Sequence, residues 1–350
     1  MGDSNEVEEI GVSTELTPNG FSAKVKSRTA SAWDRLWGSK VEKRSIPIEA
    51  ENAEAKAISD GRVKMINALS EIGVERLKSD PEFAARAVEN MFPSLLRRQD
   101  NKDAVLEVAL EDLRQNPRSP GQDSSGSETL DDSFLNRFER YAEEATVDVL
   151  RAKWGKVLAA EIRAPGTFNA KVLRVVDELD APTALLFERF CHHRLRDVVV
   201  KCLAGALSFE DQTRLVSSGL LVDPGLLGQQ RMFAETTDNR GTPLWIMNFD
   251  IALVAILRET SIPKGELTPI ASGDGVPGVP VYVLTDVGYA VSSILQDRQE
   301  MAFATYFDQL AAFLAPAEVR EYRNNGNDQA ELIRALKNEV SSSVSSDVSE

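Results

Sequence analysis

Both histidines and both cysteines of the chain lie in one short region. Cys191, His192 and His193 are consecutive, and Cys202 follows later in the same predicted helical stretch. Thiolate and imidazole groups are ligands that Zn²⁺ prefers, so this clustering raises the hypothesis of a metal site. Adjacent side chains on a helix point in different directions, however, so the three consecutive residues would not face one ion without unwinding. We therefore expect no metal site, and we interpret both cysteines as small core residues.

Other catalytic patterns are also missing from the sequence. Neither histidine lies near a Gly-x-Ser-x-Gly turn, which leaves a Ser-His-Asp triad with little support. The glycine-rich loop 272–278 lacks the Lys-Ser/Thr pair of a phosphate-binding P-loop. Paired carboxylates such as Asp131-Asp132 and Glu143-Glu144 fall in a predicted linker or on solvated helix faces. We find no catalytic constellation and expect no cofactor.

The most specific signal in the chain is an amphipathic helix that ends at a proline. One helical face carries the apolar residues Leu150, Trp154, Val157, Leu158 and Ile162. Pro165 and Gly166 cannot continue this helix, and Trp154 is the expected anchor of the core. Glu161 lies one position from the apolar face, just before the break. An ion pair or a capping role is favoured there over acid–base chemistry.

The fold class expected from these patterns is mainly α with a smaller α+β part, a helical bundle followed by a winged-helix-like module. The bundle is inferred from successive helical patterns with short connections. The module is inferred from a helix, strands and a strand–Thr–x–x–Gly–helix ending at 281–295. The predicted parts are a disordered acidic start and basic Trp-containing arm (1–45), an N-terminal helical region (46–115), a linker (116–132), a helical core bundle (133–205), a winged-helix-like α+β module (206–300), C-terminal helices (301–336) and a disordered tail (337–350).

The arm before the first helical region is basic in an otherwise acidic chain. Residues 24–44 hold seven Lys and Arg against two acidic residues, a net charge of +5. Trp33 and Trp37 lie one helical turn apart, with Arg35 and Lys40 close by. This pattern suits contact with a membrane surface or an anionic partner. The alternative, which we favour, is that both tryptophans pack on the body of the protein.

Composition restricts the function further. The 350-residue chain has a net charge of -15 and two cysteines, so a disulfide framework is excluded and a reducing cytoplasm is expected. The acidic start lacks the basic residues and the apolar core of a secretory signal. No apolar run reaches the ~18 residues that a membrane-spanning helix needs. Residues 208–300 hold six Lys and Arg against twelve Asp and Glu, which disfavours nucleic acid as a partner.

Several stretches together resemble a bacterial family of unknown function (DUF type) over about residues 45–300. Among them are Leu135–Ala145, Val175–Asp180 and Val281–Gly288. The core motif Trp-Gly-x-Val-Leu-Ala-x-Glu-Ile-x-x-Pro-Gly-Thr-Phe at 154–168 carries most of this resemblance. The same motif is distantly similar to the abortive-infection alpha (Abi-alpha) proteins of phage defence. The resemblance implies no activity, cofactor or catalytic residue.

The working hypothesis is a bacterial cytoplasmic protein that acts as a non-enzymatic interaction or regulatory module, with a link to phage defence. Its expected partner is another protein or a second copy of itself, with peripheral membrane contact through the basic arm as a further option. Two alternatives stay open: a DNA-associated regulator that uses the winged-helix-like module, and an enzyme of unrecognised type.

Overall fold

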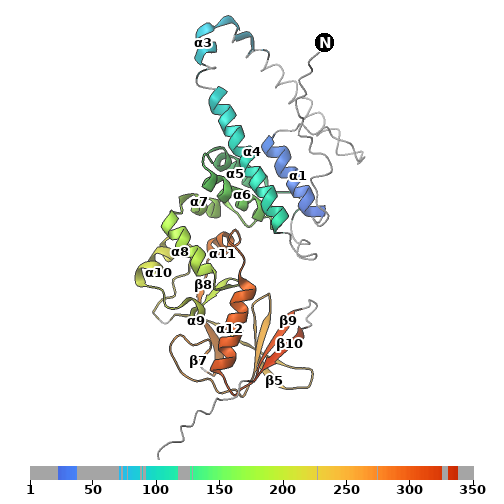
Figure 1. Cartoon of the computed structure of the whole chain (residues 1–350), viewed down its shortest axis with the longest axis vertical. Coiled ribbons are helices and arrows are strands. Elements are labelled where there is room, and N and C mark those ends of the chain that lie inside the picture. The colour runs from blue at the N-terminus through green and yellow to red at the C-terminus, as the bar shows by residue number, and fades with distance from the viewer. Residues whose placement is uncertain are drawn as a thin grey trace, which may run out of the picture. The chain divides into compact units, whose positions relative to one another are not determined.

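A computed structural model of the chain is shown in Figure 1. It describes residues 23–37, 71, 74–76, 78–86, 89, 92–116, 127, 129–226, 228–273, 275–324 and 330–337. The chain divides into two compact units, Met1–Ala170 and Lys171–Glu350. The predicted disordered tail, apart from residue 337, lies outside the described residues, as do the acidic start before residue 23 and Lys40.

Unit 1 is helical in its described part. Its helices are α1 (Ala23–Trp37), α3 (Pro81–Arg86), α4 (Phe92–Gln115), α5 (Asp132–Glu143) and α6 (Asp148–Arg163). The C-terminal half of α4 packs along α6, and both contact α5. Helix α1 packs against all three of these helices. In Figure 1 the N-terminal half of α4 extends beyond α1, α5 and α6.

Trp154 anchors the core of unit 1, as the sequence predicted. Its side chain is 2% exposed and stacks on Tyr141 with ring centroids 4.5 Å apart. Phe138 meets the same ring edge-on at 6.2 Å. The next residue, Gly155, lets α4 approach closely, because a Cβ there would lie 2.5 Å from Cγ1 of Val108. A tryptophan and a glycine side by side therefore set the spacing of these helices.

Local signals define the ends of several helices. Pro81 begins α3, and the Asp131 carboxylate caps the start of α5 by accepting from the amides of Ser133 and Phe134. Helix α6 ends at Arg163, just before Pro165. Gly166 has a φ of 88°, a left-handed conformation that glycine adopts without strain. The predicted stop after α6 is confirmed.

Unit 2 contains two antiparallel sheets as well as helices. Helix α7 (Ala170–Glu178) starts at the last residue of unit 1 and continues into unit 2. The other helices are α8 (Ala181–Cys191), α9 (Lys201–Ala204), α10 (Phe209–Ser217), α11 (Asp286–Ser292) and α12 (Gln299–Phe313). The strands are β1 (Arg194–Leu195), β2 (Val198–Val200), β3 (Gln229–Met232), β4 (Ala234–Thr237), β5 (Pro243–Asn248), β6 (Leu253–Leu257), β7 (Ala271–Gly273), β8 (Val276–Val283), β9 (Val319–Asn324) and β10 (Ala330–Leu336).

The first sheet has the order β1-β2-β8-β3, with β7 also paired to β8, and the second has the order β10-β9-β6-β5-β4. One apolar core joins residues of both sheets to helix α12. Helix α12 contributes Phe303, Tyr306, Phe307 and Leu310 to it, and the Tyr306 hydroxyl donates to the Pro269 carbonyl at 3.2 Å. Unit 2 is therefore built on sheets that bury their apolar faces against a central helix.

This architecture shows that the predicted fold class is wrong. The chain is a sizeable α+β fold with two antiparallel sheets, rather than a helical bundle followed by a small winged-helix-like module. Residues 194–200, which we expected to continue a helix, form β1 and β2. Residues 319–324 and 330–336, expected to be helical, form β9 and β10. Of these strands, β2 pairs with the distant strand β8 and β9 with the distant strand β6, which a local apolar period does not reveal.

Parts of the predicted module do exist within the larger fold. The Thr285 hydroxyl caps α11 by accepting from the Gly288 amide at 3.0 Å, as expected. Residues 244–256 form most of the β5–β6 hairpin. Residues 271–283 form the β7–β8 hairpin. Among the described residues, no helix is both long and apolar enough to cross a membrane.

Candidate functional site

The cysteines and histidines of the metal hypothesis lie at the end of α8 and in α9. Cys191 is the last residue of α8, His192 and His193 follow it, and Cys202 is in α9. Burial raises the pKa of each thiol to about 12, so both stay protonated at neutral pH. Burial, together with the neighbouring His192, lowers the pKa of His193. In the part of the chain that the structure describes, no three His, Cys, Asp or Glu side chains are grouped as metal ligands.

Glu161 is a buried carboxylate that holds the chain after α6. Its side chain is 1% exposed, and its two oxygens accept hydrogen bonds from the amides of Gly166 at 2.6 Å and Phe168 at 2.8 Å. Burial raises the pKa of Glu161, and these backbone hydrogen bonds oppose the rise. Glu161 therefore caps the turn at Pro165-Gly166, which is one of the two roles that the sequence left open, the other being an ion pair.

Helix α1 carries an arginine that is completely buried. Arg28 is 0% exposed, and its guanidinium donates to the carbonyls of Ser127 at 2.7 Å and Ile162 at 3.1 Å. A longer contact of 3.4 Å reaches the Arg163 carbonyl. Ile162 and Arg163 are the last residues of α6, where carbonyls lack partners within the helix. Arg28 therefore binds α1 to the C-terminal end of α6, where a cation is also favoured by the helix dipole.

The remaining contacts show how the basic arm lies on unit 1. Val25, Ala32 and Leu36 are buried, so one face of α1 is packed. Arg35, at the edge of this face, donates to the Asn136 side chain of α5. Trp33 is half-buried. The structure thus places part of the arm against the bundle, and membrane contact through Trp33, Trp37, Arg35 and Lys40 stays a prediction.

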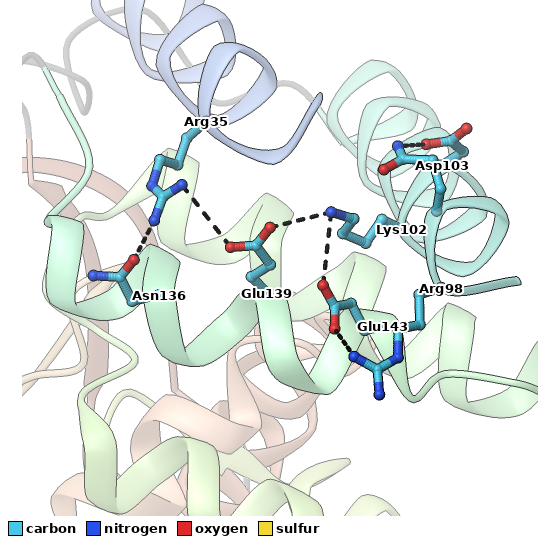
Figure 2. Close-up of polar contacts among 8 residues, drawn as sticks. Arg35, Arg98, Lys102, Asp103, Asn136, Glu139 and Glu143 are labelled. Carbon is cyan, nitrogen blue, oxygen red and sulfur yellow. Dashed lines mark hydrogen bonds and ion pairs between the residues drawn. The ribbon is translucent and has the colours of Figure 1, made fainter. Parts of the chain in front are cut away.

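A ladder of charged side chains joins α1, α4 and α5 (Figure 2). Along it the charges alternate in the order Arg35, Glu139, Lys102, Glu143 and Arg98. Lys102 is the best buried of them, with Nζ 3.1 Å from Glu139 and 3.8 Å from Glu143. The outer pairs are longer, at 4.0 Å for Arg35–Glu139 and 3.5 Å for Arg98–Glu143. Each acid faces two cations, so the ladder adds contacts that link α1, α4 and α5.

Sequence reasoning missed an exposed apolar stripe on α4. Phe92, Leu95 and Leu96 are 46%, 56% and 65% exposed, and their spacing places them on one side of the helix. Farther along the same helix, Val105 and Leu106 are buried against the bundle. The sequence shows apolar residues in both halves, and only the fold reveals that the first set is exposed in the part of the chain that the structure describes.

A second missed feature is a charged cluster in unit 2 around the β1–β2 turn. Arg196 Nε lies 3.0 Å from an oxygen of Asp250, which follows β5. Asp197 accepts from Arg231 of β3 at 2.6 Å, and the Arg196 amide donates to Gln299 at the start of α12. Arg196 and Asp250 both have positive φ, 60° and 67°, which is uncommon for residues other than glycine. The cluster ties the turns of the two sheets together.

Comparison with known proteins finds one region that is similar to a family. Residues 85–198 match the model of a family described as "Protein of unknown function (DUF2806)". This match supports a domain of unknown function in this region. The DUF2806 match covers all of α4 to β1, including the core motif around Trp154 and Glu161. It supports the resemblance to a family of unknown function, whereas the likeness to Abi-alpha proteins is not confirmed. No curated protein and no solved structure matches the chain.

Proposed function

We propose that this chain is an interaction module that pairs with a second copy of itself through the N-terminal half of α4. The observation that carries the proposal is the exposed stripe of Phe92, Leu95 and Leu96 on a helix whose other half is packed in the bundle. Adjacent large apolar side chains at high exposure are typical of protein interaction sites. A twofold axis would place the same stripe on both sides of the contact, which makes it complementary to itself.

The charge distribution favours a second copy at this place. The whole chain has a net charge of -15, so two copies repel each other over most of their surface. Residues 92–103 hold three cations and two acids, a net charge of +1. The N-terminal half of α4 is therefore where two copies can approach with little electrostatic cost. Added salt should screen the remaining repulsion and strengthen the dimer.

Sedimentation velocity of the purified full chain tests this proposal. A dimer of micromolar affinity, about -8 kcal/mol, is well populated at protein concentrations of about 10 µM. We expect the double variant Leu95→Glu/Leu96→Glu to sediment as a monomer, because each copy would place carboxylates in the contact. Circular dichroism would check that the helices are kept.

Two matched controls make the result specific. Val149→Glu in α6 and Leu185→Glu in α8 change residues that are 78% and 58% exposed on other elements, so both should dimerise like the unaltered chain. A monomeric unaltered chain at about 100 µM, where a micromolar dimer would dominate, contradicts the proposal. Equal dimerisation of the α4 variant and the controls contradicts it as well.

The proposal includes a bacterial cytoplasmic location, which the chemistry of the cysteines supports. Cys191 and Cys202 are free thiols, as is usual in a reducing compartment. The link to phage defence stays a prediction. It would gain support if cells producing the chain survive phage challenge and cells producing the Leu95→Glu/Leu96→Glu variant do not.

A further inference from the structure

The exposed stripe on α4 lies on the same side of the helix as residues that the bundle covers farther along. Leu95 and Lys102 are seven residues apart, about two helical turns, so their side chains point in nearly the same direction. Nζ of Lys102 lies 3.1 Å from Glu139 and 3.8 Å from Glu143, both on α5 (Figure 2). Leu106, about three turns after Leu95, is 4% exposed. The side of α4 that carries the stripe in its first half is therefore the side that the bundle covers in its second half.

Helix α5 runs antiparallel to α4 and ends just before the stripe. Glu139 contacts Lys102, whereas Glu143, one turn later on α5, also reaches Arg98, one turn earlier on α4, at 3.5 Å. Residue numbers thus rise along α5 as they fall along α4. Glu143 is the last residue of α5, so this helix ends beside Arg98. The stripe at residues 92–96 lies beyond that end.

We propose that the α4 helices of two copies pair in the antiparallel direction, each lying in the space beyond the end of the other copy's α5. This inference rests on the proposed self-association and adds the direction and the register of the two helices. The second copy then covers the side of α4 that carries the stripe, as α5 covers the same side farther along.

The position of α5 rules out the parallel direction. Packed helices have axes about 8–10 Å apart, and each helix is about 10 Å thick. A parallel pair about a twofold axis would bring both copies of α5 between the two α4 helices, because α5 lies on the side of the stripe. Two further helices do not fit into that space. An antiparallel pair instead places the two bundles at opposite ends of the contact.

The exposure of the stripe sets the register. Leu95 and Leu96 are its most exposed side chains, at 56% and 65%, so the twofold axis passes beside them. Phe92 of one copy then lies opposite Gln99 of the other. The Gln99 amide donates to the Asp103 side chain at 2.6 Å, so its polar group is already satisfied. The contact therefore joins residues 92–99 of both copies.

Disulfide formation between introduced cysteines in the full chain tests the direction. The natural thiols give a low background, because burial raises the pKa of Cys191 and Cys202 to about 12. Leu96→Cys lies beside the axis and should give a covalent dimer under mild oxidation. Gln99→Cys should not link to itself, because the two copies of this position would be about 10 Å apart along the helices, beyond the ~4 Å between the Cβ atoms of a disulfide. A mixture of Phe92→Cys and Gln99→Cys, one of them carrying an affinity tag, should give the mixed dimer.

Parallel pairing predicts the reverse pattern. Self-linking of Gln99→Cys, with no mixed dimer, overturns the inference. A chain that dimerises while Leu96→Cys and the second near-axis variant, Leu95→Cys, both stay unlinked overturns it as well. Sedimentation velocity under reducing conditions separates this failure from failure of the proposed function. A monomeric unaltered chain contradicts both, whereas a dimer with the wrong cross-links contradicts only the direction and the register.

Discussion

Arg196 and Asp250 form an ion pair in which both residues have a left-handed backbone. Nε of Arg196 lies 3.0 Å from Oδ2 of Asp250, and the φ angles are 60° and 67°. Arg196 occupies the first position of a two-residue turn between β1 and β2, where glycine, asparagine and aspartate are usual. Aspartate adopts a left-handed backbone more often than arginine does, and the Asp250 amide donates to the Asn248 side chain. The strain is therefore concentrated at Arg196.

Replacing Arg196 by glycine should cost less than replacing it by alanine. Both changes remove the partly exposed ion pair, which is worth at most about 1 kcal/mol. Only glycine adopts the positive φ of this position without strain, so Arg196→Ala should be about 1 kcal/mol less stable than Arg196→Gly. Urea denaturation measures the difference.

Arg258 provides the control for this comparison. It forms an exposed ion pair with Glu235 at 2.9 Å and has no positive φ. There the order should reverse, with Arg258→Gly less stable than Arg258→Ala by about 0.5–1 kcal/mol. If alanine is the more stable replacement at both positions, backbone strain at Arg196 does not lower the stability of the folded chain.

Arg28→Met should release α1 from the bundle. Methionine keeps much of the apolar stem but leaves the carbonyls of Ser127 and Ile162 without their charged donor, a loss of at least about 2 kcal/mol. Hydrogen exchange followed by mass spectrometry should show faster exchange across residues 23–37. Arg35→Met on the same helix removes a partly exposed contact with Glu139 and should cost less than about 1 kcal/mol. Equal effects of the two variants would contradict the anchoring role of Arg28.

Glu161→Gln should change how stability depends on pH. Because the pKa of Glu161 is raised in the folded state, its contribution to stability is present below its unfolded pKa. That contribution is lost as the pH rises through the folded pKa. Glutamine does not titrate, so the variant should gain stability relative to the unaltered chain as the pH rises above the ordinary glutamate pKa, with a slope of at most ~1.4 kcal/mol per pH unit.

Denaturant titrations of both proteins at several pH values measure this difference. Glu161→Ala serves as the contrasting variant, because it removes both acceptors from the Gly166 and Phe168 amides. It should be destabilised by about 1–3 kcal/mol for each amide left unsatisfied. A difference between Glu161→Gln and the unaltered chain that stays constant with pH would rule out titration of this carboxyl group.

Gly155→Ala should destabilise unit 1 even though alanine favours helices. The gain in helix propensity is about 1 kcal/mol, but the added methyl would lie 2.5 Å from Val108 and force α4 and α6 apart. We expect a net loss of about 1–3 kcal/mol in thermal or urea denaturation. The neighbouring change Lys156→Ala, on the exposed side of α6, should stay within about 0.5 kcal/mol. A stabilised Gly155→Ala variant would contradict the close approach of the two helices.

Sequence reasoning succeeded where structure is decided locally. The apolar period around Trp154, the stop at Pro165-Gly166 and the cap at Thr285 depend on residues within a few positions of each other. Each such element formed as predicted. The helix predictions for the residues of β1, β2, β9 and β10 were wrong because strand formation there does not depend on local signals alone. Residues 330–336 are rich in Ala, Glu, Leu and Arg, which favour helices, yet they form a strand because β9 binds β6 and offers β10 an edge.

The candidate sites depended on the fold in the same way. Phe92, Leu95 and Leu96 follow a helical period that also fits a buried face, so periodicity gives no information about what covers it. In the sequence, nothing distinguishes Arg28 from the other cations of the basic arm. Its burial follows from the packing of α1 on α6, which no local pattern of the sequence encodes.

The continuity of α4 has a mechanical consequence. Its 24 residues form one unbroken helix, which spans about 36 Å. Its C-terminal half is held against α6 at Gly155, so the exposed half behaves as a stiff rod fixed at its base. A molecule bound to Phe92, Leu95 and Leu96 would therefore be held at a set angle to unit 1. A displacement or rotation of the exposed half of α4 would be transmitted along the helix to its packed half.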